Sequence, residues 1–409
     1  MTRLYYDDSG LLTFEASVVA VDAVDGATHV RLDATAFYPT SGGQPHDLGR
    51  LVKSGVNSAG ELTPDFNVTD VIDDETTGEV VHVVAGMAAT LRVGDTVRGE
   101  IDAGRRRDHM QQHTGQHVLS AAFDRLHGVR TVSFHMGAAS STIDLAREVT
   151  GAEVERAVAE ANRVVWDDRP VLIRYATDAE AAAMPLRKES HRSGLLRLVE
   201  VPDFDLSACG GTHVPRTGVI GVIVVSGTER FKGGSRVSFL CGARALDGYN
   251  ALRDVTTATS RALSIGVPEL PDAVTRLAGE LKDQQRRIKQ LQEQVTAQLA
   301  GELRETAAAS RLGAKIVVRS QPGWDASALK FLASAVVSVP GFIVVLTGEG
   351  SPVPVVAARS SDVPFDAGAW LKDAIAALGG RGGGRPELAQ GGLAAGASDI
   401  LARASETLS

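Results

Sequence analysis

Cysteine is scarce in this sequence, because its 409 residues include only two, Cys209 and Cys241. A disulfide framework is therefore excluded, and such scarcity is typical of a protein that works in a reducing cytoplasm. Long hydrophobic runs are absent too, since the best candidates, VIGVIVV and FIVVLTG, have only the length of a strand. The first residues, MTRLYYDDSG, form no hydrophobic signal segment. We expect a cytoplasmic protein that neither crosses a membrane nor is exported.

An excess of positive charge is also missing, since the formal net charge is -8. Proteins that bind nucleic acid over their whole surface are usually basic, so this charge argues against indiscriminate binding. Basic residues do gather locally, in GRRRDH, PLRKESHR and ERFKGGSR. Such clusters are usually solvated surface, and the alternative is a track for phosphate groups.

The sequence does contain enough apolar material for several cores, with 44% hydrophobic residues. Residues 1–98 alternate short apolar stretches with Gly, Asp and Pro, which favours a small β-barrel or sandwich. Residues 99–247 mix helical and strand patterns and predict an α+β domain. Residues 248–308 are mainly helical, and residues 309–409 alternate strand-like runs with helices, as in a small α/β domain. The expected fold class is α+β multidomain.

One helix in the third segment, between about 268 and 306, carries an apolar heptad stripe. Gln284 and Gln298 interrupt it, which suggests a short coiled coil or helical hairpin. The helix either packs on its own domain or forms a contact within a homodimer. The stripe consists of Leu270, Val274, Leu277, Leu281, Ile288, Leu291 and Val295.

Two histidines and a second, distant motif indicate a metal site. His113 and His117, in HTGQH, lie one helical turn apart, so both imidazoles can face one ion. SACGGTHVP adds Cys209 and His213, and a thiolate with three imidazoles is a strong ligand set for one Zn²⁺. The alternative is a buried free cysteine and a solvated histidine. Cys241, in the apolar run VSFLCGA, is expected to be inert core.

Four protein ligands raise the question of what such an ion does. A closed tetrahedral shell is normally structural, whereas a catalytic zinc keeps one position for water. The ion therefore either only shapes a pocket or changes its shell when substrate arrives. In HTGQH, Thr114 also stands where a zinc protease carries its general base, a glutamate.

These motifs, in this order, resemble the editing domain of alanyl-tRNA synthetase and the free-standing alanyl-tRNA editing proteins of the AlaX family in its long form. The segment 36–49, AFYPTSGGQPHDLG, resembles the glycine-rich signature of the barrel that precedes the editing domain. VSFHMG and STIDL resemble the segment that lines the aminoacyl pocket. GGGRPELAQGG resembles the end of the DHH-associated C-terminal domain. The resemblance covers almost the whole chain.

The resemblance implies an N-terminal barrel (1–98), a zinc-containing editing domain (99–247), a helical linker (248–308) and a DHH-associated domain (309–409). Only 35 residues precede the glycine-rich segment, too few for an activating domain, so we expect no aminoacylation. The implied reaction is ATP-independent hydrolysis of the ester that joins serine, and sometimes glycine, to tRNA(Ala). A first pocket that selects alanine cannot strongly reject either residue, so a second hydrolytic sieve is useful.

The resemblance also places Thr131, Ser133 and His135 at the pocket, where one of them would reward the serine hydroxyl. His135 is the first choice, against the alternative of an exposed strand histidine. Thr212, inside CGGTHV, completes the expected catalytic set. An aminoacyl ester is already activated, so a cation, a positioned water and a few donors suffice. Thr114 can therefore replace the protease glutamate.

Substrate and RNA contacts are expected at two glycine-rich places. Gly42, Gly43 and Gln44 repeat the GGQ tripeptide of peptide-release factors, but the surrounding residues favour close backbone packing beside the pocket over catalysis by the glutamine. Arg381 and Arg385 suit contacts to the RNA backbone. The alternative for these arginines is a flexible surface loop. The metal-binding motif of Asp-His-His phosphoesterases is missing.

Other functions are less well supported. A metallopeptidase lacks its glutamate here. Threonyl-tRNA synthetases carry a related editing domain, but CGGTHV and the C-terminal segment point to alanine. The main alternative is a tRNA-binding protein whose zinc is purely structural, which a closed four-ligand shell would favour.

Overall fold

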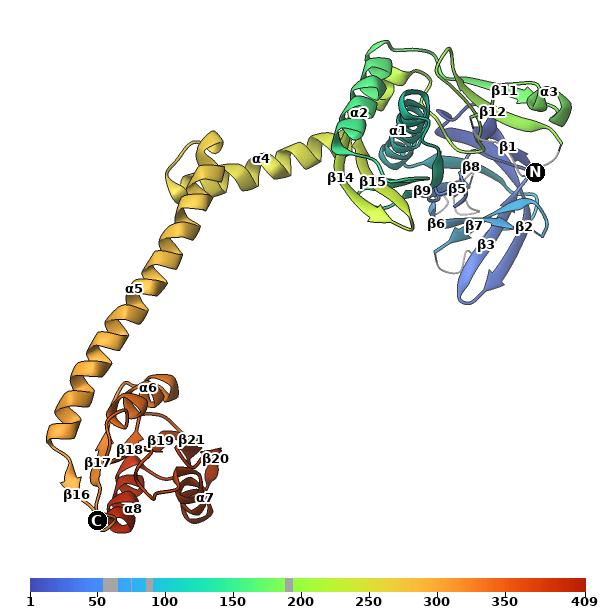
Figure 1. Cartoon of the computed structure of the whole chain (residues 1–409). Helices are drawn as coiled ribbons and strands as arrows, with labels where there is room; N and C mark the ends of the chain where they lie inside the picture. Colours follow the sequence, from blue (N-terminus) through green and yellow to red (C-terminus); the bar gives the residue numbers. More distant parts are fainter. Residues whose placement is uncertain (54–64, 75, 86–90, 188–193) are drawn as a thin grey trace. The chain divides into compact units, whose positions relative to one another are not determined.

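The computed structural model describes residues 1–53, 65–74, 76–85, 91–187 and 194–409. They form two compact units, Met1–Thr259 and Ser260–Ser409 (Figure 1). The basic run PLRKESHR lies partly outside the described residues. Among those that are described, no helix combines the length and the apolar character needed to cross a membrane. The expected α+β multidomain class is confirmed by a closed barrel and a mixed C-terminal domain.

The N-terminal barrel closes through antiparallel pairs in the order β2-β3-β7-β6-β5-β8. Its strands alternate buried and exposed residues, so one face of each fills the interior. Its last strand extends to Ile101, past the predicted boundary at 98. The strands are β2 (Thr13–Val24), β3 (Ala27–Leu32), β5 (Gly49–Lys53), β6 (Asp65–Asp74), β7 (Glu79–Val84) and β8 (Thr96–Ile101), beside a short pair, β1 (Thr2–Arg3) and β4 (Ala34–Thr35).

A buried ion pair fastens the glycine-rich segment 36–49 to the first helix, α1 (Ala103–His127). Arg106 of α1 donates to Asp47 and to the carbonyl oxygen of Ala36, and both charged side chains are fully buried. Removing one partner would leave an uncompensated buried charge, at a cost of about 3–5 kcal/mol. The segment therefore cannot shift independently of α1.

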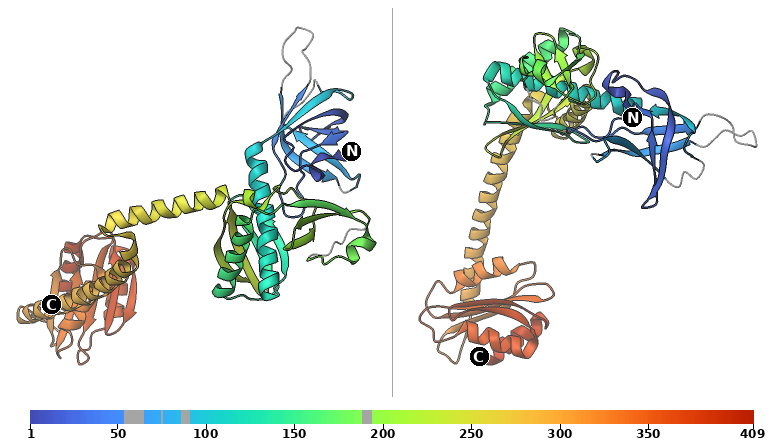
Figure 2. Two further views of the ribbon diagram at one scale, coloured as in Figure 1. Left: turned by 90° about the horizontal axis from the view of Figure 1, so that it is seen from above. Right: turned by 90° about the vertical axis from the view of Figure 1, so that its right-hand side faces the viewer.

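Helix α1 begins at the barrel and runs along α2 (Gly151–Trp166), as both views of Figure 2 show. Asp102 caps its N-terminus by accepting from Arg105 N, and Gly128 ends it with φ of 62°, as expected of a glycine stop. The two helices pack on the sheet β14-β15-β10-β9. Its strands are β9 (Thr131–Met136), β10 (Ser141–Leu145), β14 (Ile223–Phe231) and β15 (Gly234–Cys241).

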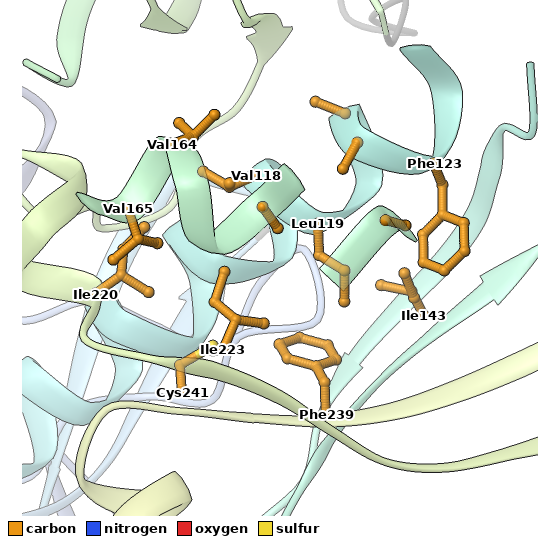
Figure 3. Packing of buried hydrophobic residues seen from close by; sticks show 14 of the residues in the cluster. Val118, Leu119, Phe123, Ile143, Val164, Val165, Ile220, Ile223, Phe239 and Cys241 are labelled. Atoms are coloured by element: carbon orange, nitrogen blue, oxygen red, sulfur yellow. The ribbon is translucent and has the colours of Figure 1, made fainter. Parts of the chain in front are cut away.

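The core between these helices and the sheet is apolar and continuous (Figure 3). Val118, Leu119 and Phe123 of α1 meet Ile143 and Phe239 of the sheet. This packing fixes the face of α1 that carries the two histidines, because the side chains that bury the helix also set its rotation.

A three-stranded antiparallel sheet, β11-β12-β13, carries the second half of the metal motif. The chain leaves β13 directly before Cys209, so the strand delivers this ligand. The elements in this part of the chain are β11 (Leu172–Ala176), α3 (Asp178–Ala182), β12 (Leu196–Val201), β13 (Asp205–Ala208) and the 3₁₀ turn η2 (Thr217–Ile220).

The second unit is built on a mixed six-stranded sheet in the order β16-β17-β18-β19-β21-β20. The end of α5 and α6 cover one face, and α7 and α8 cover the other. The strands are β16 (Ala308–Ala309), β17 (Lys315–Ser320), β18 (Phe342–Thr347), β19 (Val353–Arg359), β20 (Gly380–Arg385) and β21 (Leu388–Leu393). The helices are α6 (Ala326–Val336), α7 (Ala367–Leu378) and α8 (Ala397–Leu408).

The predicted helical segment is formed by α4 (Ala243–Leu263), a 3₁₀ turn η3 (Val267–Glu269) and α5 (Leu270–Glu305). From Val274 to Val295, the six heptad residues that follow Leu270 are exposed on α5. The glycine-rich segment with Arg381 and Arg385 is not a flexible loop but the exposed edge strand β20. Glycine is needed at Gly382 of this strand, because a Cβ there would lie 2.6 Å from the Cα of Gly391.

Candidate metal centre

The four predicted ligands meet at one point. Their ligand atoms all lie within 4.8 Å of one another. The Cys209 Sγ lies 3.4 Å from Nε2 of His113 and 3.3 Å from Nε2 of His213, and His117 completes the group. Two such atoms bound to one tetrahedral zinc lie about 3.5 Å apart. The donor set and these separations fit a zinc ion.

Two glycines allow close packing of the segments that carry the four candidate ligands. Gly115, between the two histidines of α1, packs against Cys241 of β15 so closely that a Cβ there would overlap the sulfur. Gly211 packs in the same way on the imidazole of His113. Arg197 of β12 donates to the carbonyl oxygens of Cys209 and Gly211 and so holds the ligand loop. Glycine is required at both contacts.

All three imidazoles contact a neighbouring polar side chain through Nδ1. This leaves their Nε2 atoms for the metal. An N–H donated to a fixed acceptor sets both the tautomer and the ring orientation. The three pairs are His113 with Gln44 Oε1 (2.7 Å), His117 with Asp205 Oδ2 (3.0 Å) and His213 with Thr114 Oγ1 (3.2 Å).

Gln44 is the least expected of these partners. The backbone N–H of Thr212 donates to Oε1 of Gln44 at 3.2 Å. Because an N–H must face an oxygen, this bond fixes which end of the Gln44 amide is the oxygen. The Nε2 of Gln44 donates to Thr212 Oγ1 at 2.8 Å, and both side chains are fully buried. The GGQ glutamine therefore supports the ring of a candidate metal ligand, a contact that its position in the sequence did not reveal.

We expect Gln44→Leu to weaken zinc binding by about 10–100-fold, the usual cost of losing a residue that orients a ligand. Competition against a chromophoric chelator measures this affinity. Gln112→Leu is the matched control, because the buried amide of Gln112 pairs with the backbone of Cys241 and contacts no ligand. Equal zinc affinities in the two variants would contradict a ligand-supporting role for Gln44.

Thr114 has a different place from the one expected of a substitute base. It is fully buried, and its hydroxyl oxygen accepts from His213 Nδ1 and from the backbone N–H of Val214 at 3.1 Å. Thr114 is not among the described residues that line the cavity. It replaces the protease glutamate in position only, and its contacts orient a ligand.

The electrostatics of the centre favour a thiolate. Desolvation alone would raise the pKa of Cys209, but the three neighbouring histidines hold it well below its usual value. Burial lowers the pKa of His117, but the Cys209 thiolate and Asp205 raise it, and the result is a pKa of about 9. Against the effect of burial, His117 and Arg187 hold the pKa of Asp205 below its ordinary range. A thiolate is the form that binds metal.

A cavity of about 440 Å³ opens beside the ligands. His113, His117 and Cys209 line it, while His213 lies behind them among the buried residues. Phe134 of β9 also lines the cavity and stacks on the His113 ring, with 5.4 Å between the centroids. Three of the four candidate metal-binding residues thus face a cavity large enough for a small molecule.

Thr131 and Ser133 line this cavity, as the sequence predicts, but with different contacts. Thr131 Oγ1 donates to Ser120 Oγ at 2.7 Å, and Ser120 also accepts from Gln116 at 2.8 Å. Ser133 donates to the carboxylate of Asp144. His135 is exposed and is not among the described residues that line the cavity.

The remaining predicted residues divide between the cavity and other places. Gly42 lines the cavity, and Gly43, with φ of 85°, packs so tightly that a Cβ would lie 2.6 Å from the Phe134 carbonyl oxygen. The close packing expected of the glycines is thus found at Gly43, whereas a Cβ on Gly42 would meet nothing within 4 Å. Thr212 is buried against Gln44. Cys241 is fully buried, which raises the pKa of its thiol and confirms an inert core residue.

Three protein-family models match the chain. Residues 5–105 match the class II (A) tRNA synthetases, and residues 196–238 match the second additional domain of threonyl and alanyl tRNA synthetases. Residues 313–409 match the DHHA1 domain. The first match contains the barrel, the second contains Cys209, His213 and the strands β12, β13 and β14, and the third contains most of the second unit.

Curated relatives match this chain along nearly its whole length. Alanyl-tRNA editing protein AlaX-L of Pyrococcus horikoshii is 30% identical over 99% of this chain and 98% of that protein. The alanine–tRNA ligases of Pyrococcus furiosus and Halorubrum lacusprofundi are 31% and 33% identical over 95% of this chain. The chain spans only 41% and 42% of the length of these two ligases.

Proposed function

Since the chain belongs to the AlaX-L family of alanyl-tRNA editing proteins, we propose that it is a zinc-dependent deacylase that hydrolyses the ester of tRNA(Ala) mischarged with serine. The observation that carries the proposal is the cavity, which three metal ligands and the predicted pocket segment line together. A metal centre enclosed away from any cavity would favour a purely structural ion.

The reaction adds water to the carbonyl carbon and breaks its bond to the ribose oxygen. The products are free serine, as a carboxylate and a released proton, and tRNA with its terminal hydroxyl restored. A zinc ion held by His113, His117, Cys209 and His213 would supply Lewis acidity and lower the pKa of water. The chain's own residues orient the imidazoles and form a cavity wall that restricts solvent at the ester.

We assign recognition of the serine hydroxyl to Thr131. Its hydroxyl proton is used in the bond to Ser120, so its oxygen keeps acceptor capacity for a substrate O–H. An alanyl ester has no O–H to offer, so the acceptor would then stay unpaired at a cost. His135, the first choice from the sequence, is exposed and is not among the described residues that line the cavity, and Ser133 is also exposed, whereas Thr131 is partly buried.

Thr131→Val is expected to lower kcat/KM for seryl-tRNA(Ala) by about 10–100-fold, because it removes one hydrogen bond of about 1–3 kcal/mol. Thr131→Ser keeps the hydroxyl and is the matched control. Release of the esterified amino acid is followed with seryl-, glycyl- and alanyl-tRNA(Ala), and His135→Ala is included. If kcat/KM for seryl-tRNA(Ala) falls in His135→Ala but not in Thr131→Val, recognition of the serine hydroxyl belongs to His135 instead.

The same assay separates the proposed function from its alternative. Wild-type protein is expected to release serine and spare alanine, and not to charge tRNA when given ATP and alanine. Bound zinc and bound tRNA without any release would identify a tRNA-binding protein with a structural zinc. Release of glycine would extend the substrates, although glycine lacks the hydroxyl that Thr131 would recognise.

Three further assignments complete the proposal. Arg381 and Arg385 on the exposed strand β20 are proposed to contact phosphates of the tRNA, and Gly42, Gly43 and Gln44 shape the cavity end of the substrate site. The exposed apolar stripe of α5 is proposed as a homodimer contact, because a stripe of this kind seldom stays in water.

A further inference from the structure

Tyr6 differs from the other tyrosines around the cavity. Tyr5, Tyr6, Tyr38 and Tyr175 all line it. The Tyr5 hydroxyl accepts from Arg3, and those of Tyr38 and Tyr175 donate to the Ser41 carbonyl oxygen and to Asp7. Within the described part of the chain, the Tyr6 hydroxyl has no hydrogen-bond partner. The Tyr6 hydroxyl is thus free to contact a ligand.

The Tyr6 hydroxyl also lies beside the ligand loop. A Cβ placed on Gly210, the residue after Cys209, would stand 3.5 Å from this hydroxyl oxygen. This separation is ordinary van der Waals contact, so the phenol covers Gly210. The free hydroxyl is therefore close to the metal ligand that lines the cavity.

The position of Tyr6 relative to this loop is fixed. One guanidinium, that of Arg197, donates to the backbone oxygen of Tyr6 at 2.9 Å and to the carbonyl oxygens of Cys209 and Gly211. The Tyr6 ring packs edge-on against Tyr5, and Arg3 lies 5.8 Å from its centroid. A donor held in this way needs no reorganisation when charge develops nearby.

Several other side-chain donors around the cavity are engaged, and the one nitrogen of Arg197 that has no partner, Nη2, is itself buried. Gln116 and Thr131 both donate to Ser120, and Arg187 donates to the carboxylate of Asp205. During ester hydrolysis, negative charge grows on the carbonyl oxygen, and this atom needs a donor. Tyr6 supplies an O–H that the fold leaves unused.

We propose that the Tyr6 hydroxyl donates a hydrogen bond to the carbonyl oxygen of the aminoacyl ester. This assignment rests on the proposed function and adds a substrate-contacting residue to it. The turn Leu4–Tyr6 of the N-terminal segment thereby becomes part of the site, although it lies far from the metal motif in the sequence.

Tyr6→Phe tests the proposal, because phenylalanine keeps the ring against Tyr5 and Arg3 and removes only the hydroxyl. We expect kcat for seryl-tRNA(Ala) to fall by about 100-fold with little change in KM, as for loss of one oxyanion donor. Tyr249→Phe is the control, because Tyr249 is exposed on α4 and is not among the described residues that line the cavity, and it should keep the wild-type kcat. Zinc content and melting temperature, measured for both variants, should match the wild-type values.

Each outcome decides the proposal. A Tyr6→Phe kcat within twofold of wild type overturns it, and so does a rise in KM alone, which would indicate uniform binding at the ribose instead. Loss of zinc or of stability in Tyr6→Phe would overturn it in favour of a structural role. Failure of the wild-type protein to release serine would overturn the proposed function and this assignment together, whereas the other outcomes affect the assignment alone.

Discussion

Replacement of Cys209 with alanine is expected to release zinc and to lower serine release from tRNA(Ala) by more than about 100-fold. Loss of a residue that merely orients a ligand costs about 10–100-fold in metal affinity, so loss of the ligand itself should exceed that range. Cys209 is also the only anionic ligand among the four, and it contacts Nε2 of both His113 and His213. Without it, three imidazoles must hold a divalent ion alone.

The second cysteine provides a matched control. Cys241→Ala removes the other thiol of the chain, but Cys241 is buried in the apolar core and no metal ligand contacts it through a hydrogen bond in the described residues. It should keep one zinc per chain and the wild-type rate, with a slightly lower melting temperature from the small cavity. Zinc is measured by elemental analysis. Full zinc occupancy and full activity in Cys209→Ala would refute the four-ligand centre.

The Cys209→Ala experiment also bears on whether the metal is structural. Because metal binding contributes to folding free energy, loss of zinc should lower the melting temperature of this variant. If serine release disappears at a temperature where circular dichroism and tRNA binding remain as in wild type, the ion acts in the reaction. If tRNA binding and folded structure are lost together, the ion serves the fold.

The clustering of the four residues of the candidate metal centre could be predicted because its geometry is largely local. His113 and His117 share a helix face at any i, i+4 spacing, and CGGTH holds Cys209 and His213 within one loop. The order of the motifs likewise predicted the barrel and the C-terminal domain. Gln44 could not be found in this way, because it approaches His113 from 69 residues away, through a segment fastened by a buried ion pair.

The pocket residues show a second limit of the sequence. In a regular strand, Thr131, Ser133 and His135 would share one face, and TVSFHM does not say which face meets the metal. In β9, an irregularity intervenes: Ser133 pairs with Asp144, and Thr131 with the next residue, Leu145. Since successive residues of β10 face opposite sides, Thr131 and Ser133 do too.

This bulge explains why only part of the predicted set reaches the interior. Phe134 stacks on His113, so its neighbours Ser133 and His135 lie on the opposite face of β9, where Ser133 bonds to Asp144 although it also lines the cavity. The bulge returns Thr131 to the side where it bonds to the buried Ser120. An irregularity of this kind leaves no mark on hydrophobic periodicity, so the sequence gives no means of choosing between the three residues.

Gly211→Ala is expected to disrupt the metal centre almost as severely as loss of a ligand. A Cβ at this position would overlap the Cε1 and Nδ1 atoms of His113 and approach Gln44 Oε1 to 3.1 Å. The ring cannot retreat, because Phe134 stacks on it and Gln44 holds its Nδ1. The loop cannot retreat either, because Arg197 holds the carbonyl oxygen of Gly211. We therefore expect zinc affinity to fall by at least about 100-fold.

The neighbouring glycine is a stringent control. A Cβ on Gly210 would meet nothing closer than 3.5 Å, so Gly210→Ala adds the same methyl group to the same loop without a clash. It also removes the same backbone freedom from the unfolded chain, so a difference between the variants reports contact with the ligand alone. Zinc affinity is measured by chelator competition. Activity is less suitable, because Gly210 lies under Tyr6, so a change in activity could come from Tyr6 as well as from the metal. Equal affinities in the two variants would mean that His113 can move, and that Gln44 does not hold it.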